Sequence, residues 1–471
     1  MSGFPSVLVA ATLLAAALPA QFTLRPGQVE VLPALSYATD HATVAINRRG
    51  DVLVAYNTSK DLGGVATKQV EAVFVPRVAP GQWQIPSLQQ VQLLGDPALA
   101  LLGTTDRCDK PDVVAVGNDF LVVWPRTQVG HPDLPARLEL AVFRAGPVGA
   151  GTFDVPQPGE GWLVDPSFLP GGAGAMPDLA WMSVDPQHPG VVREGAAVVV
   201  YARRESKSGN LENYDLVATA IDAAGSTPQF NGPALLAQHI PVDTTSGYPG
   251  AGGGRVLPDV VQDDQGGLVV AYESFALAAR GTPTDEGRIH VRRYEALPAG
   301  GFTETDALEL QAGAPDQRHR RPNLMASRFD ASDTVGLAWP QMAPDGTSTR
   351  AHHGVIELLA GGGMQFVDSQ LPDHPVFEEG RPVPVHGDNL RACVMDLKDV
   401  ALGRAEIGFL ATQPALGSGI LERRGQGPER TALDLGEQLP GSGGVQLMVR
   451  VFESFPAGAS NERLFIELLA L

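Results

Sequence analysis

A cassette that recurs about every 60 to 80 residues constrains the fold more than any other feature of this sequence. Each copy opens on a Pro-Asp or Pro-Asn pair, runs as an apolar strand, turns at Gly, Asp or Asn, and continues into a second strand that ends in an aromatic residue. Clear copies read "PDVVAVGNDFLVVW", "PDVVQDDQGGLVVAY" and "PNLMASRFDASDTVGLAW". Repeats of this length are typical of arrays in which each unit buries its apolar faces against its neighbours.

Most strand pairs are followed by a third apolar strand and a fourth, irregular strand. Four antiparallel strands joined by short turns make one blade of a β-propeller. The segments between the apolar runs are rich in Gly, Pro, Asp and Thr and carry no amphipathic helix, which disfavours a parallel α/β sheet. The sequence therefore predicts an all-β propeller with units that begin near residues 42, 111, 177, 258, 322, 382 and 430.

The two ends of the chain predict how the ring closes. The segment 443–454 repeats the pattern of 266–274, and "RLFIELLAL" supplies one further strand. The strand that would complete this unit is available near the N-terminus, in "QFTLRPGQVEVL". Closure by an N-terminal strand leaves no free sheet edge. We therefore expect seven four-stranded blades closed in this way; six blades plus a β hairpin is the alternative, because "RTALDLGE" is a weak first strand.

Residues 1–20 have the pattern of a secretory signal. The stretch "VLVAATLLAAAL" is too short to span a bilayer and is followed by Pro19-Ala20, a small-residue cleavage site. The preceding "MSGFPS" carries no Lys or Arg, so a buried N-terminal strand or helix is the alternative. We expect residues 21–471 to form a single exported domain, in the periplasm, at the cell surface or outside the cell, with no membrane span.

The charge of the chain bears on what it binds, and its cysteines bear on whether it forms a disulfide. The chain has 53 acidic and 34 basic residues and a net charge of −19, which disfavours binding to nucleic acid. Export permits disulfides, but the only cysteines are Cys108 and Cys393. The sequence leaves two alternatives: a disulfide between Cys108 and Cys393, or two separate thiols.

Common catalytic motifs are absent from the sequence: it has no GxSxG, HExxH, CxxC, P-loop or EF-hand pattern. We therefore expect no cofactor and no metal site. The tripeptide Arg49-Gly50-Asp51 is an adhesion motif in other settings, but here it falls on a predicted turn. One aromatic residue per unit is predicted to pack between blades, namely Tyr56, Trp124, Tyr201, Tyr272, Trp339 and Phe452.

Basic residues gather just ahead of the predicted inner strands. The inner strands of a propeller begin at one end of the central channel, so the residues that precede them surround its mouth. The candidate ligand-binding residues at this mouth are Asp40, His41, Arg107, Lys110, Arg255, Arg320, Arg321 and Arg381. Their cations predict a site for carboxylate, sulfate or phosphate. The alternative is that they pair with acidic residues on the same face, namely Asp109, Asp112, Asp178, Asp259, Glu378 and Glu379.

An acidic residue recurs directly after the proline of the cassette. Asp112, Asp178 and Asp259 hold equivalent positions, and Asn323 holds a fourth. We interpret these side chains as structural acceptors of backbone N–H groups from an adjacent turn. The alternative is that Asp40, Asp112 and Asp259 face one another and split their pKa values to act as acid and base.

With this cassette the chain resembles secreted bacterial β-propeller proteins, a loose group that includes the sialidase-like propellers. "SDTVGLAW" approaches the S-x-D-x-G-x-x-W box of sialidases, but Asp333 stands one place early. The resemblance implies a fold and no catalytic residue.

The absence of catalytic motifs favours a non-catalytic binding or scaffold protein that engages an acidic glycan or a protein at the channel mouth. The alternatives are a glycan-active hydrolase or lyase with an Arg-lined central pocket, and a structural envelope protein.

Overall fold

The computed structural model describes residues 23–30, 39–61, 66–79, 82–84, 91–95, 105–108, 110–129, 137–146, 151–156, 158–165, 177–184, 193–208, 211–243, 256–277, 283–297, 301–310, 318–319, 322–326, 334–342, 349–359, 362–368, 383–387, 390–399, 404–413, 417–425, 428–435, 447–454 and 463–470. Every regular element within these ranges is a β-strand. The expected all-β class is confirmed.

Five sheets each contain four antiparallel strands, and each is named here after its inner strand. The β2 sheet holds β2 (Thr39–Ile46), β3 (Val52–Asp61), β4 (Ala66–Val75) and β7 (Gln92–Gly95). The β14 sheet holds β14 (Asp178–Trp181), β15 (Ala196–Ser208), β16 (Leu211–Asp222) and β17 (Gln229–Asp243). The β18 sheet holds β18 (Asp259–Gln262), β19 (Leu268–Leu277), β20 (Pro283–Ala296) and β21 (Phe302–Leu310).

The other two four-stranded sheets come from the C-terminal part of the chain. The β27 sheet holds β27 (Val383–Gly387), β28 (Leu390–Asp399), β29 (Arg404–Gln413) and β30 (Gly417–Gly425). The β31 sheet has the order β31 (Pro428–Leu435), β32 (Leu447–Ser454), β33 (Arg463–Ala470) and β1 (Thr23–Glu30). Strand β1 from the N-terminal part of the chain pairs antiparallel with β33 from the C-terminal part.

Two sheets contain extra strands but still have four strand positions. The β9 sheet holds β8 (Thr105–Cys108), β9 (Asp112–Val116), β10 (Asp119–Val129), β11 (Arg137–Ala145), β12 (Gly151–Asp154) and β13 (Trp162–Leu163). The β23 sheet holds β22 (Arg318–His319), β23 (Asn323–Ala326), β24 (Thr334–Met342), β25 (Thr349–Leu358) and β26 (Met364–Asp368). Strands β8 and β9 both pair with β10, and β22 and β23 both pair with β24, so each pair occupies one strand position. A short ribbon of β5 (Arg77–Ala79) and β6 (Gln82–Trp83) stands beside these sheets.

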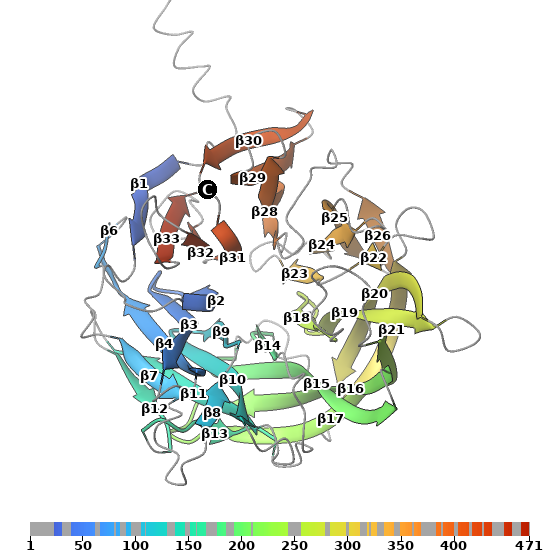
Figure 1. Cartoon of the computed structure of the whole chain (residues 1–471), viewed down its shortest axis with the longest axis horizontal. Helices are drawn as coiled ribbons and strands as arrows, with labels where there is room; N and C mark the ends of the chain where they lie inside the picture. The colour runs from blue at the N-terminus through green and yellow to red at the C-terminus, as the bar shows by residue number, and fades with distance from the viewer. Residues whose placement is uncertain are drawn as a thin grey trace, which may run out of the picture.

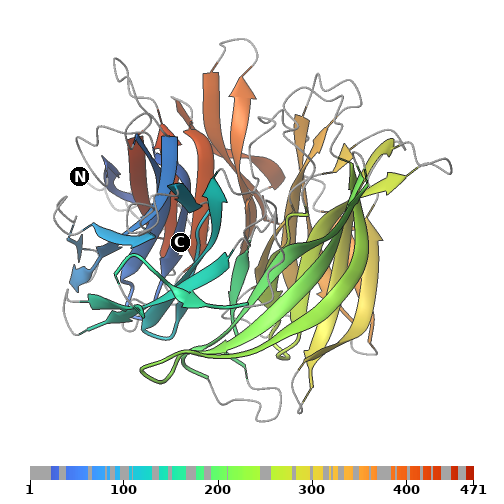
Figure 2. The ribbon, with the colours of Figure 1, turned by 60° about the horizontal axis from the view of Figure 1, so that its bottom comes forward.

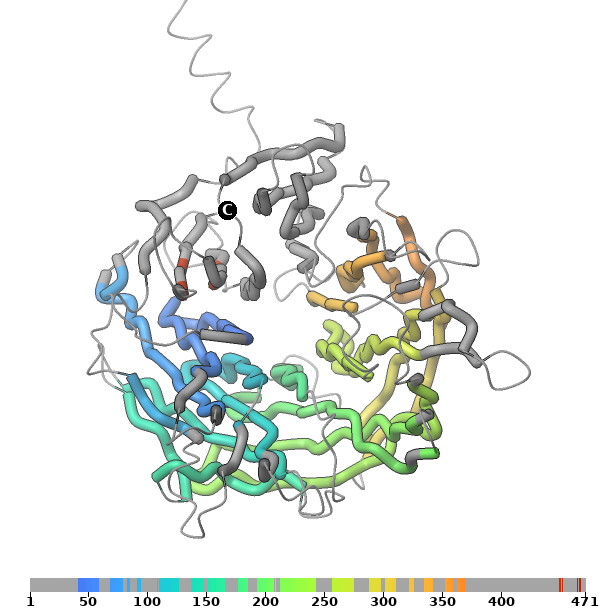
Figure 3. The backbone as a smooth tube through the Cα atoms, viewed as in Figure 1, coloured from blue at the N-terminus to red at the C-terminus, as the bar shows by residue number. Residues whose placement is uncertain are grey.

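The sheets lie side by side around a common centre (Figure 1), and the tilted view shows them standing next to one another (Figure 2). The inner strands contact one another in the order β2, β9, β14, β18, β23, β27, β31, and β31 contacts β2 again. The coloured part of the tube drawing follows the chain from β2 to β26 along part of this ring (Figure 3). Antiparallel four-stranded units arranged radially define a β-propeller.

Apolar residues fill the spaces between neighbouring sheets. One buried cluster joins the β2 and β9 sheets, another joins the β9 and β14 sheets, and a third joins the β14 and β18 sheets. Because neighbouring sheets cover both faces of each second strand, residues 52–56 of β3 are all buried. This explains why these second strands read as continuous apolar runs instead of alternating patterns.

The recurring aromatic residues occupy these interfaces, as predicted: Tyr56, Trp124, Tyr201 and Trp339 are fully buried. Their expected position at the ends of the second strands is wrong, because β3 continues to Asp61 and β10 to Val129. Each second strand extends past its aromatic residue because it also pairs with the long third strand of its sheet.

Candidate functional site

The structure describes the predicted channel-mouth residues to different extents. His41 and Lys110 are described with their side chains, and both are half-buried. Of Asp40 in β2 and Arg107 in β8, only the backbone is described. The remaining candidates lie outside the described residues: Arg255, Arg320, Arg321 and Arg381.

His41 and Lys110 share an unusual backbone conformation. Their φ angles are 52° and 40°, in the left-handed region that L-residues other than Gly seldom adopt. The two residues hold equivalent places, since each stands two positions before the inner-strand residue, Thr43 or Asp112, whose partner on the second strand directly precedes the aromatic residue. Strain of this kind persists only where the surrounding structure imposes it, and it gathers at ligand-binding sites.

A β-bulge accompanies each left-handed residue. Between Asp40 and Thr43, three steps along β2 match two steps along β3, from Asn57 to Ala55. The β9 sheet has the same surplus, because four steps from Cys108 to Asp112 match three along β10.

The β23 sheet shows the same surplus between His319 and Asn323, where four steps match three along β24. A bulge inserts one residue and re-aims its side chain. The N-terminal end of the inner strand position is therefore irregular in the same way in three sheets.

Asn57 braces the bulge of the neighbouring sheet. Its Nδ2 donates to the carbonyl oxygen of Cys108 at 2.8 Å, and its Oδ1 accepts from the backbone N–H of Lys110 at 2.7 Å. Asn57 is fully buried, and an amide side chain can donate and accept at once. Sequence reasoning missed this residue; the available signal is a polar residue directly after the aromatic Tyr56.

The acidic residues after the cassette prolines connect successive inner strands. Asp112 in β9 accepts from the backbone N–H of Leu179 in β14 at 2.7 Å, and Thr43 Oγ1 in β2 donates to its other oxygen at 3.1 Å. Asp112 therefore ties the β9 sheet to both of its neighbours.

The same bond recurs around the ring. Asp178 in β14 accepts from the N–H of Val260 in β18 at 2.6 Å, and Asp259 in β18 accepts from the N–H of Leu324 in β23 at 3.0 Å. We call this series of inter-sheet bonds the aspartate ladder.

The structural interpretation of these carboxylates is confirmed, but the expected donor is wrong. The N–H groups come from the next inner strand instead of an adjacent turn, because radial packing brings the start of each inner strand beside its neighbour. Each ladder carboxylate has an oxygen engaged by a backbone N–H, which supports a structural role over paired acid–base catalysis.

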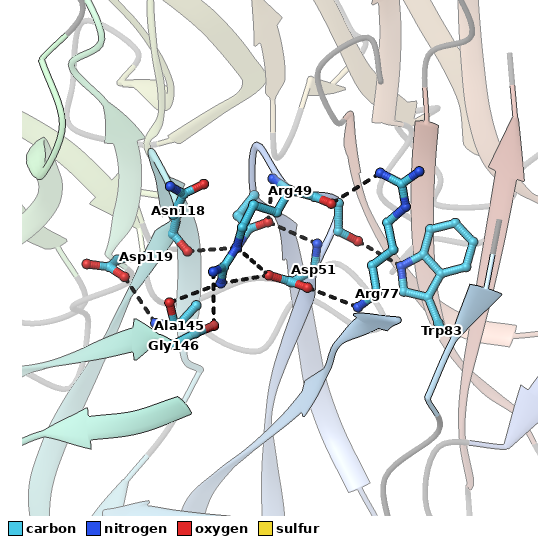
Figure 4. Close-up of polar contacts among 10 residues, drawn as sticks. Arg49, Asp51, Arg77, Trp83, Asn118, Asp119, Ala145 and Gly146 are labelled. Atoms are coloured by element: carbon cyan, nitrogen blue, oxygen red, sulfur yellow. Dashed lines mark hydrogen bonds and ion pairs between the residues drawn. The ribbon is translucent and has the colours of Figure 1, made fainter. Parts of the chain in front are cut away.

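The opposite end of the ring carries a second polar network, shown in Figure 4. Asp51 follows the β2–β3 turn and is buried. It forms an ion pair with Arg49 at 2.9 Å, and it accepts from Asn47 Nδ2 at 3.1 Å and from the N–H of Arg77 at 2.9 Å. The Arg-Gly-Asp tripeptide is thus a turn, as interpreted from the sequence, and its two charged side chains bind each other.

Arg49 also reaches the neighbouring sheet, where Nη1 and Nη2 donate to the carbonyl oxygens of Gly146 at 2.9 Å and Ala145 at 3.0 Å (Figure 4). Arg48 extends one sheet further. Its Nη1 lies 3.0 Å from Glu194 Oε1, and its guanidinium carbon stands 5.0 Å from the ring centre of Trp181. Arginines at this end therefore join three successive sheets.

Replacing Asp51 by alanine is expected to lower the free energy of unfolding by about 2 kcal/mol, because the backbone N–H of Arg77 loses its acceptor and the amide of the buried Asn47 loses one of its two. Denaturant unfolding measures the loss. Arg49→Met is the matched comparison and should cost less than Asp51→Ala, since Arg49 is partly exposed and Asp51 keeps its hydrogen bonds from Asn47 and Arg77. Equal losses in the two variants would contradict the assigned role of Asp51.

Three other expectations concern metals, cysteines and membranes. Within the described ranges, no cluster of three or more His, Cys, Asp or Glu side chains has a metal-binding arrangement. Cys108 is buried, while the side chain of Cys393 lies outside the described part, so the pairing of the cysteines stays open. No helix among the described residues has the length and hydropathy that crossing a membrane requires.

No protein-family model and no curated protein matches this chain. Solved structures resemble it at the level of the fold. A Dyadobacter fermentans protein of unknown function is 10% identical, over 96% of this chain and 99% of that chain, with a TM-score of 0.46. The GH93 α-L-arabinofuranosidase of Fusarium graminearum, in complex with arabinobiose, is 10% identical, over 77% and 92%, with a TM-score of 0.43.

The hemagglutinin-neuraminidase of parainfluenza virus 5, with the ligand DANA, is 9% identical, over 95% of this chain and 94% of that chain, with a TM-score of 0.41. At these identities and TM-scores, the similarities carry no argument about the activity or ligand of this chain.

Proposed function

We propose that this protein is an exported, non-catalytic β-propeller that binds an acidic glycan or an acidic protein surface at the channel mouth. One observation carries the proposal: His41 and Lys110, at equivalent places in two sheets, are both held in the left-handed conformation. The backbone of Lys110 is fixed there by the buried Asn57.

The two residues stand close to each other in the ring. Strands β2 and β9 are in contact, and Thr43 and Asp112, each two positions after a left-handed residue, are hydrogen-bonded. A left-handed L-residue costs about 1–2 kcal/mol of free energy. Two such residues at equivalent places of neighbouring sheets therefore concentrate backbone strain there. The side chains so placed are an ammonium and an imidazole, in a chain whose net charge is −19. Positive charge at one place on an acidic protein favours an anionic ligand.

The proposal includes the ring architecture and the destination of the chain. Seven blades, with β1 completing the blade of β31, β32 and β33, would leave no open sheet edge at the junction of the two chain ends. The signal-like pattern of residues 1–20, which lie outside the described part, supports export.

Thermal unfolding of the mature protein with simple anions, acidic sugars and sulfated glycans tests the site, because a ligand that binds the native state raises the unfolding midpoint. Lys110→Asn should abolish the ligand-induced shift, yet raise the midpoint without ligand, since Asn tolerates the left-handed conformation. Lys110→Arg, which keeps the charge, should retain the ligand-induced shift.

Two outcomes would overturn the proposal. If no anion shifts the midpoint of the wild type, or if Lys110→Asn responds like the wild type, the mouth is not an anion site. Release of reducing sugar from any glycan in the panel would show a hydrolase instead of a non-catalytic binder.

A further inference from the structure

Two paired strands of the β2 sheet carry a buried polar patch. Residues that alternate along a strand share one face, and so do residues paired across two strands. Tyr56 and Thr58 of β3 pair with Glu71 and Gln69 of β4, so all four side chains lie on one face. Thr58 is fully buried, and Gln69 and Glu71 are 4% and 6% exposed. Polar groups at this depth need hydrogen-bond partners inside the molecule.

The β31 sheet covers this face at Tyr56. Tyr56 belongs to the buried cluster that also contains Val451 of β32 and Leu464 of β33. Thr58 stands two residues further along β3, where its backbone pairs with Thr39, the first residue of β2. The patch therefore adjoins the interface between the β2 and β31 sheets, beside the N-terminal end of the inner strand β2.

The amide of Gln69 has a fixed orientation. Its Nε2 donates to Glu71 Oε1 at 2.6 Å. The reversed amide would set its carbonyl oxygen against a carboxylate oxygen, and two acceptors cannot form a hydrogen bond. Gln69 Oε1 is therefore the end of the amide that needs a donor other than Glu71.

Two neighbouring oxygens of the patch are buried and unsatisfied. Within the part of the chain that the structure describes, neither Thr58 Oγ1 nor Gln69 Oε1 has a hydrogen-bond partner. Thr58 and Gln69 are direct cross-strand partners, and the Cβ atoms of such a pair stand about 5 Å apart. One small molecule can therefore reach both oxygens.

We propose that one ordered water molecule binds between Thr58 and Gln69 as a fixed part of the fold. The water accepts from the Thr58 hydroxyl and donates to Gln69 Oε1, so that both groups are satisfied. Buried waters hold about two to four polar partners. The second hydrogen of the water needs one more acceptor, and the Glu71 carboxylate on the same face is such a group. This water site does not depend on the proposed ligand.

The sign of a stability change tests the proposal. Thr58→Val keeps the shape of the side chain and removes its hydroxyl. If the hydroxyl bonds a water, the variant loses a hydrogen bond, and its equilibrium constant of unfolding should rise about fivefold. Thr58→Ser keeps the hydroxyl and is the matched control. A Thr58→Val variant more stable than the wild type would overturn the proposal, because removing an unbonded buried hydroxyl stabilises a protein.

A double-mutant cycle tests whether one water serves both residues. Gln69→Met removes the amide at similar volume. The factor by which it raises the equilibrium constant of unfolding should be about threefold smaller in the Thr58→Val background than in the Thr58→Ser background, because the first background has already lost the shared water. Equal factors in the two backgrounds would overturn the bridge.

A high-resolution crystal structure of the full chain locates the water directly. We expect a peak of electron density within hydrogen-bond distance of Thr58 Oγ1 and Gln69 Oε1 in the wild type and in Thr58→Ser, and its loss in Thr58→Val. A protein side chain bonded to both oxygens, or a metal ion between them, would overturn the assignment of a water.

Discussion

Replacing Arg126 by methionine is expected to lower the free energy of unfolding by about 3–5 kcal/mol, the largest loss that the charged residues predict. Arg126 Nη1 lies 3.4 Å from Glu139 Oε1, with the two side chains 6% and 4% exposed. Arg126 also donates to the carbonyl oxygen of Gly159 at 3.2 Å. Without the guanidinium, a buried carboxylate has no opposite charge. Urea unfolding at constant ionic strength measures the loss.

The loss should depend on pH. Burial is the main cause that raises the pKa of Glu139 above its ordinary value, and Arg126 opposes it. A raised native pKa means that the folded state holds the proton more tightly than the unfolded state. Stability therefore falls as pH rises from the unfolded pKa through the native pKa. Removing Arg126 raises the native pKa further, so its cost should be smaller near about pH 4 than near about pH 7.

The double variant Arg126→Met with Glu139→Leu is the control. Replacing both charges by apolar groups removes the desolvation cost as well as the attraction, so the double variant should recover most of the stability lost by Arg126→Met alone. A single variant as stable as the wild type, or a loss that does not change between the two pH values, would contradict the assigned role of the pair.

Replacing Trp124 by alanine is expected to cost about 3–5 kcal/mol, because it opens a cavity between the β2 and β9 sheets. Trp124 is fully buried in the apolar cluster that joins these sheets. The packing around it is close: a Cβ built on Gly161 would lie 2.8 Å from Trp124 Cη2. Denaturant unfolding of the variant measures the cost.

Trp124→Phe is the matched variant and should cost less than about 2 kcal/mol. Among the described residues, no group accepts a hydrogen bond from the buried Nε1 of Trp124, so phenylalanine removes a donor that has no partner there. Tyr201→Phe provides the contrast, because Tyr201 donates its hydroxyl to the buried Asp165 at 2.6 Å. If Trp124→Phe costs more than Tyr201→Phe, the indole nitrogen has a role that this packing does not explain.

The candidate site shows which features a sequence can and cannot predict. The cassette placed Lys110 and His41 ahead of inner strands, but His41 lies within β2. The left-handed conformation of both residues could not be predicted, because it depends on the extra residue that pairing with the second strand leaves in the inner strand. Asn57 was missed for a related reason. Its two bonds go to residues 51 and 53 positions away along the chain, and no local pattern indicates such partners.

The sequence by itself determined the all-β class, the four-stranded unit, and the aromatic residues at the interfaces between units. These properties depend on turns, strand periodicity and apolar runs, which act over short stretches and are visible in the order of residues. Only the tertiary structure decided the partners of the ladder: Asp178 accepts from Val260, 82 positions along the chain, because the ring sets their inner strands side by side. Hydrogen bonds between units depend on how the units pack, and that arrangement arises only when the ring is assembled.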